Sequence, residues 1–384
     1  MGLAGFAIGV VTGHGLMARP AAALLALLAC TAAPMWWYEA RRHAAAQPRP
    51  GEARHSTTSR RRWRLYGLVV AGGLWAATLN LLPLANASVT DGFWLALPPL
   101  LPLLLAGALL YVLWPEGTEV AGLERIGQWL HRRPAAQRFP WPLLRDQLVK
   151  AFFLPLMISF AYRWAGQSEP VLAQNMTAVH WYALTVALLY LVDTAFGTVG
   201  YLSTAKRLGA QIQSSNPYWL GWAAALVCYP PFFTWLQDVG FTYRDGYQWS
   251  AWLAQSPVLL HVWGTAVVLL TAIYALSTVV FGIRFSNLTH RGIITHGPYR
   301  WSKHPAYISK NLSWWLVSIP FVSNAGVATA AVHCLILLCI NGIYWLRART
   351  EERHLMHDPV YREYALWISR HGLIAKLLRR HPTT

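Results

Sequence analysis

The stretch from Asn287 to His304 (NLTHRGIITHGPYRWSKH) concentrates side chains that can do chemistry between two apolar segments. Its Gly-Pro pair favours a tight turn, and Tyr and Trp stand beside it. The side chains that carry or can carry positive charge include Arg291, Arg300, Lys303 and His304. A turn followed by aromatic and basic side chains is typical of a loop that binds an anion or a cofactor. The alternative is an ordinary basic loop on the cytoplasmic side of a membrane.

A second group lies about fifty residues further on. Arg347 and Glu351 are four residues apart, so on a helix they share one face. Glu351 can then hold the guanidinium of Arg347, whose planar fork suits a substrate oxygen. The alternative is a solvated helix beside the membrane with ordinary ion pairs four residues apart.

These two groups resemble parts of a known family. The string GPYRWSKHPAY at 297–307 resembles the G-P-Y-R-x-x-R-H-P-x-Y signature of the isoprenylcysteine carboxyl methyltransferase family, which also covers phospholipid methyltransferase-like membrane enzymes. RARTEERHL at 347–355 and YREY at 361–364 are similar to its R-x-x-x-E-E-x-x-L and Y-x-x-Y elements, in the same order. The resemblance spans residues 281–370, roughly a quarter of the chain.

The resemblance implies a site for S-adenosylmethionine (SAM), formed by the loop, a two-span hairpin and the C-terminal tail. Aromatic faces suit the sulfonium or the adenine. His304, with Pro305 fixing the backbone after it, can donate to the SAM carboxylate, and a Glu can take the ribose hydroxyls or the ammonium. The residues expected to bind SAM are Gly297, Tyr299, Arg300, His304, Pro305, Tyr307, Glu351 and Glu352.

The resemblance also implies a lipid-like or isoprenoid-linked acceptor that enters sideways from the bilayer and is methylated on a carboxylate, hydroxyl or amine. We expect Arg347 to steer the acceptor oxygen. A carboxylate acceptor needs no base, whereas a hydroxyl or amine benefits from one, and Glu352 or Asp193 is the candidate. Asp193 lies in the apolar string YLVDTAFG, and a carboxylate in lipid is costly enough to indicate a functional or paired role.

The chain departs from the family pattern on the acceptor side. After Tyr307 the family usually has a small residue and then Gly, whereas this chain has Ile-Ser-Lys-Asn. We therefore expect the acceptor to contact Lys310, Asn311 and Trp314, although Lys310 can also extend along the helix towards water. Asp358-Pro359 replaces the Gly that usually precedes the Y-x-x-Y element.

The residues named above must be held in place by the apolar segments of the chain. Of the 384 residues, 55% are hydrophobic and 12% charged, and the mean hydropathy is +0.32. A soluble protein is about one-quarter charged, so these figures indicate an integral membrane protein and exclude a disordered chain. We expect an all-α polytopic fold of about ten transmembrane helices with a C-terminal helical hairpin as the methyltransferase core. The expected spans are Leu3–Met17, Ala21–Tyr38, Leu65–Leu84, Phe93–Trp114, Leu148–Trp164, Met176–Phe196, Tyr218–Leu236, Val258–Phe281, Ala306–Val322 and Gly326–Trp345.

The net charge is +17, and most of the Lys and Arg residues lie between these spans. We therefore attribute the positive charge to the orientation of the protein in the membrane and not to nucleic-acid binding. Lys and Arg gather at 41–64, 132–138, 206–207, 291–303 and after 347. Counting crossings puts all of these segments on one side, so we expect both termini in the cytoplasm. Richness in Ala, Arg, Pro and Trp suggests a bacterial inner membrane. The four cysteines and the histidines show no metal-ligand spacing, so no metal is expected.

We expect residues 1–280 to form N-terminal transmembrane helices that serve as a scaffold or bind the acceptor, and 281–384 to form the SAM-binding region. Two alternatives remain. One is an NAD(P)H-dependent membrane reductase of sterols or isoprenoids, although a phosphate-bearing cofactor would prefer cations to Glu351 and Glu352. The other is a lipid transporter or scaffold without enzyme activity, although the sequence shows no symmetry between halves. The oligomeric state and the acceptor (a lipid, a polyprenyl-linked group or a glycolipid) stay open.

Overall fold

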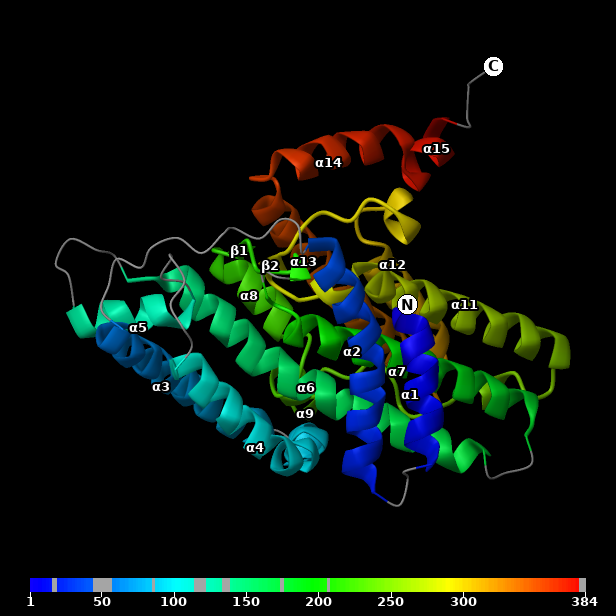
Figure 1. Ribbon diagram of the computed structural model, residues 1–384. Coiled ribbons are helices and arrows are strands. Elements are labelled where there is room, and N and C mark those ends of the chain that lie inside the picture. Colours follow the sequence, from blue (N-terminus) through cyan, green and yellow to red (C-terminus); the bar gives the residue numbers. More distant parts are fainter. Residues whose placement is uncertain are drawn as a thin grey trace.

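The computed structural model describes residues 1–15, 19–43, 57–84, 87–113, 122–132, 139–172, 176–205 and 208–379 (Figure 1). Helices make up most of this part of the chain. Its only strands are β1 (Ser214–Ser215) and β2 (Thr289–His290), which pair antiparallel with Ser214 opposite His290. The expected all-α fold is therefore confirmed.

The helices follow one another in chain order, with short 3₁₀ turns (η) between some of them. They are α1 (Gly2–Gly15), α2 (Pro20–His43), α3 (Thr57–Leu81), η2 (Leu82–Leu84), η3 (Ala87–Thr90), α4 (Asp91–Leu113), α5 (Leu123–Arg132), α6 (Trp141–Leu172), α7 (Ala178–Leu202), α8 (Trp219–Leu226), α9 (Phe232–Asp238), α10 (Trp249–Trp252), α11 (Pro257–Phe281), η5 (Gly282–Arg284), η6 (Gly297–Arg300), α12 (Pro305–Ser318), α13 (Val327–Leu355), α14 (Pro359–His371) and α15 (Leu373–Arg379).

Seven of the described helices are long and apolar enough to cross a membrane: α2, α3, α4, α6, α7, α11 and α13. The protein is thus an integral membrane protein, and seven of the ten expected spans are confirmed as such helices. The other three are shorter. α1 is a short apolar helix, α12 has only 14 residues, and the expected span Tyr218–Leu236 is divided into α8 and α9. The division falls at Pro230-Pro231, because prolines cannot donate the helical hydrogen bond.

α6 and α7 lie at the centre of the bundle. In the most apolar stretch of each, 61% of the residues are buried inside the protein, against 6% for α4. Phe153 of α6 and Phe196 of α7 belong to the large central core, to which α2 and α4 also contribute. Most of the apolar surface of α4 is therefore available to contact lipid. α6 and α7 form the central pair of the bundle, and α11 packs on α7.

α5 packs on α3 at one side of the bundle (Figure 1). Its buried Glu124 accepts hydrogen bonds from Arg60, at 2.5 Å, and from Arg64, at 3.2 Å. Part of the positive charge expected in the loop at 41–64 is therefore neutralised inside the protein. Residues 44–56, 133–138 and 206–207, which carry other charges used for the topology, lie outside the described residues.

α12 and α13 form the expected hairpin, and α14 and α15 lie across the end of the bundle (Figure 1). α14 begins at Asp358, whose carboxylate accepts a hydrogen bond from the amide of Val360 at 2.7 Å, as a helix N-cap does. Its buried face carries Tyr361, Tyr364 and Ile368, which pack on the loop before α12. The C-terminal tail is thereby held over the mouth of the hairpin.

Candidate functional site

A cavity of about 1220 Å³, open mouth included, lies at this end of the bundle. Its wall comes from the end of α11, the loop before α12, and the facing sides of α12, α13 and α14. Asn216, Tyr229 and Tyr274 also line it, although they precede the boundary expected at residue 281. The cavity thus draws on both expected regions, and their boundary stays a prediction.

The Gly-Pro turn is built as the loop motif requires. Gly297 has a φ of +61°, and a Cβ there would lie 2.9 Å from Cγ2 of Val280. The turn places Tyr299 edge-on to Phe281, with ring centroids 5.1 Å apart, and the hydroxyl of Tyr364 donates to the Tyr299 carbonyl at 2.8 Å. Burial raises the pKa of the Tyr299 hydroxyl well above its usual value, so it stays protonated at neutral pH.

Glu352 ties the loop to α13. Its Oε1 lies 3.0 Å from Nε2 of His304, and its Oε2 lies 2.7 Å from Nζ of Lys303. Both carboxylate oxygens are therefore engaged, and Glu352 stands behind the cavity wall and does not line it. The imidazole of His304 does line the cavity and stacks on the ring of Tyr307, at an interplanar angle of 4°.

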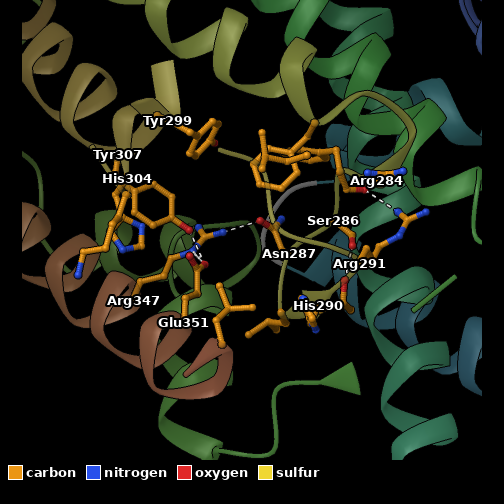
Figure 2. Close-up of a pocket in the computed structure, with 18 of the residues that line it drawn as sticks. Arg284, Ser286, Asn287, His290, Arg291, Tyr299, His304, Tyr307, Arg347 and Glu351 are labelled. Carbon is orange, nitrogen blue, oxygen red and sulfur yellow. Dashed lines mark hydrogen bonds and ion pairs between the residues drawn. The ribbon is translucent and has the colours of Figure 1, made fainter. Parts of the chain in front are cut away.

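Arg347 lies at the centre of the wall, where only 3% of it is exposed. Figure 2 shows its guanidinium between Glu351 and Asn287, beside the ring of Tyr307. Nε donates to Oε1 of Glu351 at 3.3 Å, and Nη2 donates to Oδ1 of Asn287 at 2.5 Å. The hydroxyl of Tyr307 donates to the same Glu351 oxygen, and its ring centroid lies 5.0 Å from the Arg347 carbon Cζ. The expected pairing of Arg347 with Glu351 is therefore present.

Asn287 is a site residue that sequence reasoning missed. Its backbone N–H donates to the hydroxyl of Tyr201 at 2.9 Å, and its Nδ2 donates to the hydroxyl of Tyr229 at 3.2 Å. Its remaining polar atom, Oδ1, is the one that accepts from Arg347. The available signal was its position as the first residue of the polar stretch, but one Asn after an apolar helix does not reveal which side chain it will meet.

Lys310 lines the cavity one turn beyond Tyr307, while its neighbour Asn311 does not. The Lys310 ammonium lies 5.0 Å from the ring centroid of Tyr274 and 5.3 Å from that of Trp314. Asn311 is instead joined to the hairpin, because its Oδ1 accepts from the side-chain amide of Asn341 at 2.8 Å. Trp314 contributes its ring beside Lys310 and is not part of the cavity wall.

Asp193 is buried in α7, behind the wall. Its two oxygens accept hydrogen bonds from Tyr274, at 2.7 Å, and from Thr278, at 2.5 Å. Both partners line the cavity. Asp193 is therefore hydrogen-bonded to two hydroxyl groups of α11, and its functional role stays a prediction.

The structure thus separates the expected site residues into two sets. Those in the cavity wall are Tyr299, His304, Tyr307, Lys310, Arg347 and Glu351. Those outside the wall are Gly297, Arg300, Pro305, Asn311, Trp314, Glu352 and Asp193. Of the second set, Arg300 is exposed and Pro305 begins α12.

Two further polar side chains, those of Tyr361 and His290, belong to the cavity wall. The hydroxyl of Tyr361 is buried and has no hydrogen-bond partner within the described residues. His290, beside Ser286 and Asn287 in Figure 2, lies 3.2 Å from a carboxylate oxygen of Asp358. Burial lowers the pKa of His290 more than Asp358 raises it, so the imidazole is neutral at neutral pH. In the part of the chain that the structure describes, no three His, Cys, Asp or Glu side chains form a group able to hold a metal ion.

Comparison with known families agrees with the motifs. Residues 258–357, from α11 to just beyond α13, match the sequence model of the isoprenylcysteine carboxyl methyltransferase family. The match confirms the resemblance carried by the loop and by the Arg-Glu element, and it supports a membrane methyltransferase. No curated protein and no solved structure matched the chain.

Proposed function

We propose that this protein transfers the methyl group of SAM to a lipid-like acceptor that stays in the bilayer. The observation that carries the proposal is the convergence of Tyr299, Tyr307, Arg347 and Glu351 on one cavity. All four belong to the segment that matches the family, yet they come from a loop and two helices. We further propose that this end of the bundle faces the cytoplasm of a bacterial cell, where SAM is available.

The chemistry of the wall fits SAM. Rings of Tyr299 and Tyr307 offer faces that attract a sulfonium cation or stack on adenine. Glu351 offers a carboxylate to the ammonium, and His304 offers a donor to the carboxylate. The buried hydroxyl of Tyr361 lacks a protein partner among the described residues, as a group reserved for a ligand would. When bound, SAM supplies a methyl group already activated by its positive sulfur.

The chain's own residues then hold the acceptor in position, which is the main contribution a protein makes to a direct displacement. The guanidinium of Arg347 lines the cavity between Glu351 and Asn287, and we assign it to the acceptor oxygen. The oxygens of Glu352 and Asp193 are already engaged. We therefore assign Glu352 to holding the loop and Asp193 to positioning Tyr274 and Thr278.

Calorimetric titration of the full chain in detergent with SAM and with NADPH tests the donor site. We expect SAM to bind, and His304→Ala and Glu352→Gln each to weaken it at least tenfold, about 1.4 kcal/mol. His371→Ala is the matched control, because His371 is exposed on α14, where its imidazole stacks on Trp367 of the same helix. Binding of NADPH in place of SAM would favour a reductase, and binding of neither would favour a scaffold.

Tritium-labelled methyl transfer tests the acceptor. Membranes that contain the protein are incubated with methyl-labelled SAM, and label is expected in the lipid fraction. Mass spectrometry of lipids from cells with and without the protein then identifies the methylated species. Label found only in protein would contradict a lipid-like acceptor.

A further inference from the structure

Three aromatic rings surround the ammonium of Lys310. Its Nζ lies 5.0 Å from the centroid of Tyr274, 5.3 Å from that of Trp314 and 5.8 Å from that of Tyr344. The rings come from α11, α12 and α13, so the cage exists only in the folded bundle. Cages of this kind recognise ammonium ligands. Here the cation inside the cage belongs to the protein itself.

The cage around Lys310 has hydrogen-bond donors in excess of acceptors. An ammonium has three donors and no acceptor, and Lys310 donates no hydrogen bond to any described residue. The carboxylate of Asp193 acts on Lys310 through its charge, but its two oxygens accept from Tyr274 and Thr278. The ammonium of Lys310 therefore has donors to offer to a ligand, while each oxygen of Asp193, behind the wall, already accepts one hydrogen bond.

The cage adjoins the place assigned to the acceptor. The guanidinium of Arg347 lies 5.9 Å from the centroid of Tyr344, the ring that also contacts Lys310. Two cations therefore flank one ring. Oxygens of Glu351 and Asn287 accept hydrogen bonds from Arg347, whereas Lys310 lines the cavity with its ammonium among three aromatic rings.

We propose that Lys310 determines the charge of the acceptor. Its ammonium fills the cage, so an acceptor headgroup with an ammonium finds the cation site occupied and meets a like charge. The same ammonium donates to an anionic oxygen, so the acceptor carries a carboxylate or a phosphate within reach of Lys310. This inference rests on the proposed function and adds the class of acceptor, an anionic amphiphile. Lys310 directly follows Ile308 and Ser309, where the chain departs from the family's small residue and Gly.

Binding of three short amphiphiles to the full chain in lipid nanodiscs tests this assignment. The probes are octyl phosphate, octanoate and octyltrimethylammonium, which share a tail and differ in headgroup. We expect the wild-type protein to bind at least one anion more tightly than the ammonium. Whichever anion binds more tightly identifies phosphate or carboxylate. A wild-type protein that prefers the ammonium would overturn the proposal.

Two substitutions separate the charge of Lys310 from its bulk. Lys310→Met keeps the length and empties the cage of charge, so we expect anion affinity to fall and octyltrimethylammonium affinity to rise, each at least tenfold. Lys310→Arg is expected to keep the preference for anions. If Lys310→Met does not fold, Lys310→Gln makes the same comparison. Lys376→Met, at an exposed position of α15, is the matched control and should behave as wild type.

SAM titration of the same variants distinguishes failure of the Lys310 proposal from failure of the proposed function. We expect SAM affinity to stay within threefold in all of them, because Lys310 lies beyond Tyr307 on the acceptor side. Variants that bind SAM but keep the wild-type headgroup preference would overturn the role of Lys310 alone. A wild-type protein that does not bind SAM would overturn the proposed function instead.

Discussion

Replacement of Asn287 by alanine tests which residues fix the orientation of the Arg347 guanidinium. The guanidinium of Arg347 donates to Asn287 at 2.5 Å and to Glu351 at 3.3 Å. Alanine removes the shorter of these hydrogen bonds and leaves Nη2 buried, in a side chain that is 3% exposed. Arg347 would then be free to turn about its hydrogen bond with Glu351, away from the acceptor.

The size of the effect follows from the type of hydrogen bond that alanine removes. A hydrogen bond to a charged group contributes about 1.5–3 kcal/mol. At 1.4 kcal/mol for each factor of ten, this corresponds to a roughly 10- to 150-fold decrease in rate. Because Asn287 holds the acceptor side, the decrease should appear in turnover, and SAM affinity should stay within about threefold.

Transfer of tritium from methyl-labelled SAM to membrane lipids measures turnover, and calorimetry measures SAM affinity. Asn287→Asp is the matched variant, because an aspartate oxygen can still accept from Arg347 and the hydroxyl of Tyr229 can donate to the other oxygen. We expect this variant to keep most of the rate. A double-mutant cycle with Arg347→Lys should give a coupling energy of about 0.5–3 kcal/mol. Equal decreases in the Ala and Asp variants, or additive effects in the cycle, would refute the reasoning.

Three further predictions concern the cofactor, the loop and the topology. Tyr361→Phe should weaken SAM about 2- to 10-fold, the contribution of one neutral hydrogen bond, and leave the thermal midpoint of the ligand-free protein unchanged; unaltered SAM affinity would contradict the assigned ligand contact. Gly297→Ala should lower the thermal midpoint, because the left-handed backbone conformation is about 1–2 kcal/mol less favourable for a residue with a Cβ. The added Cβ would also clash with the side chain of Val280. A wild-type midpoint would show that the loop relaxes freely. Reporters fused after Asp245 and after Arg379 should lie in opposite compartments, and a shared compartment would rule out the expected topology.

Features set by spacing along one helix could be predicted from the sequence. The membrane class follows from apolar length and low charge, and seven of the expected spans appear as helices of sufficient length. Residues four apart on a helix must share a face, and Arg347 does meet Glu351. The two adjacent prolines between α8 and α9 lack the amide hydrogens that a continuous helix needs, which accounts for the break there.

Features that depend on how helices pack could not be predicted. Asn287 meets Arg347 across 60 residues, and the cage around Lys310 needs rings from three helices. From the sequence, Arg60 and Arg64 are predicted to be charges of a loop, because no nearby residue indicates that they form ion pairs with Glu124. Such contacts arise from tertiary geometry, which spacing within one segment does not encode.

α13 has a consequence for how this protein can vary. It is a single uninterrupted helix from Val327 to Leu355, so its residues keep a fixed rise of about 1.5 Å and a rotation of about 100° each. Tyr344 and Glu352 are therefore about 12 Å apart along the axis. Insertion of one residue between them would turn Glu352 about 100° away from His304 while Tyr344 stayed beside Lys310. We therefore expect changes in chain length to be better tolerated near the start of α13 than between Tyr344 and Glu352, where an insertion would separate the contact with Lys310 from the contact with His304.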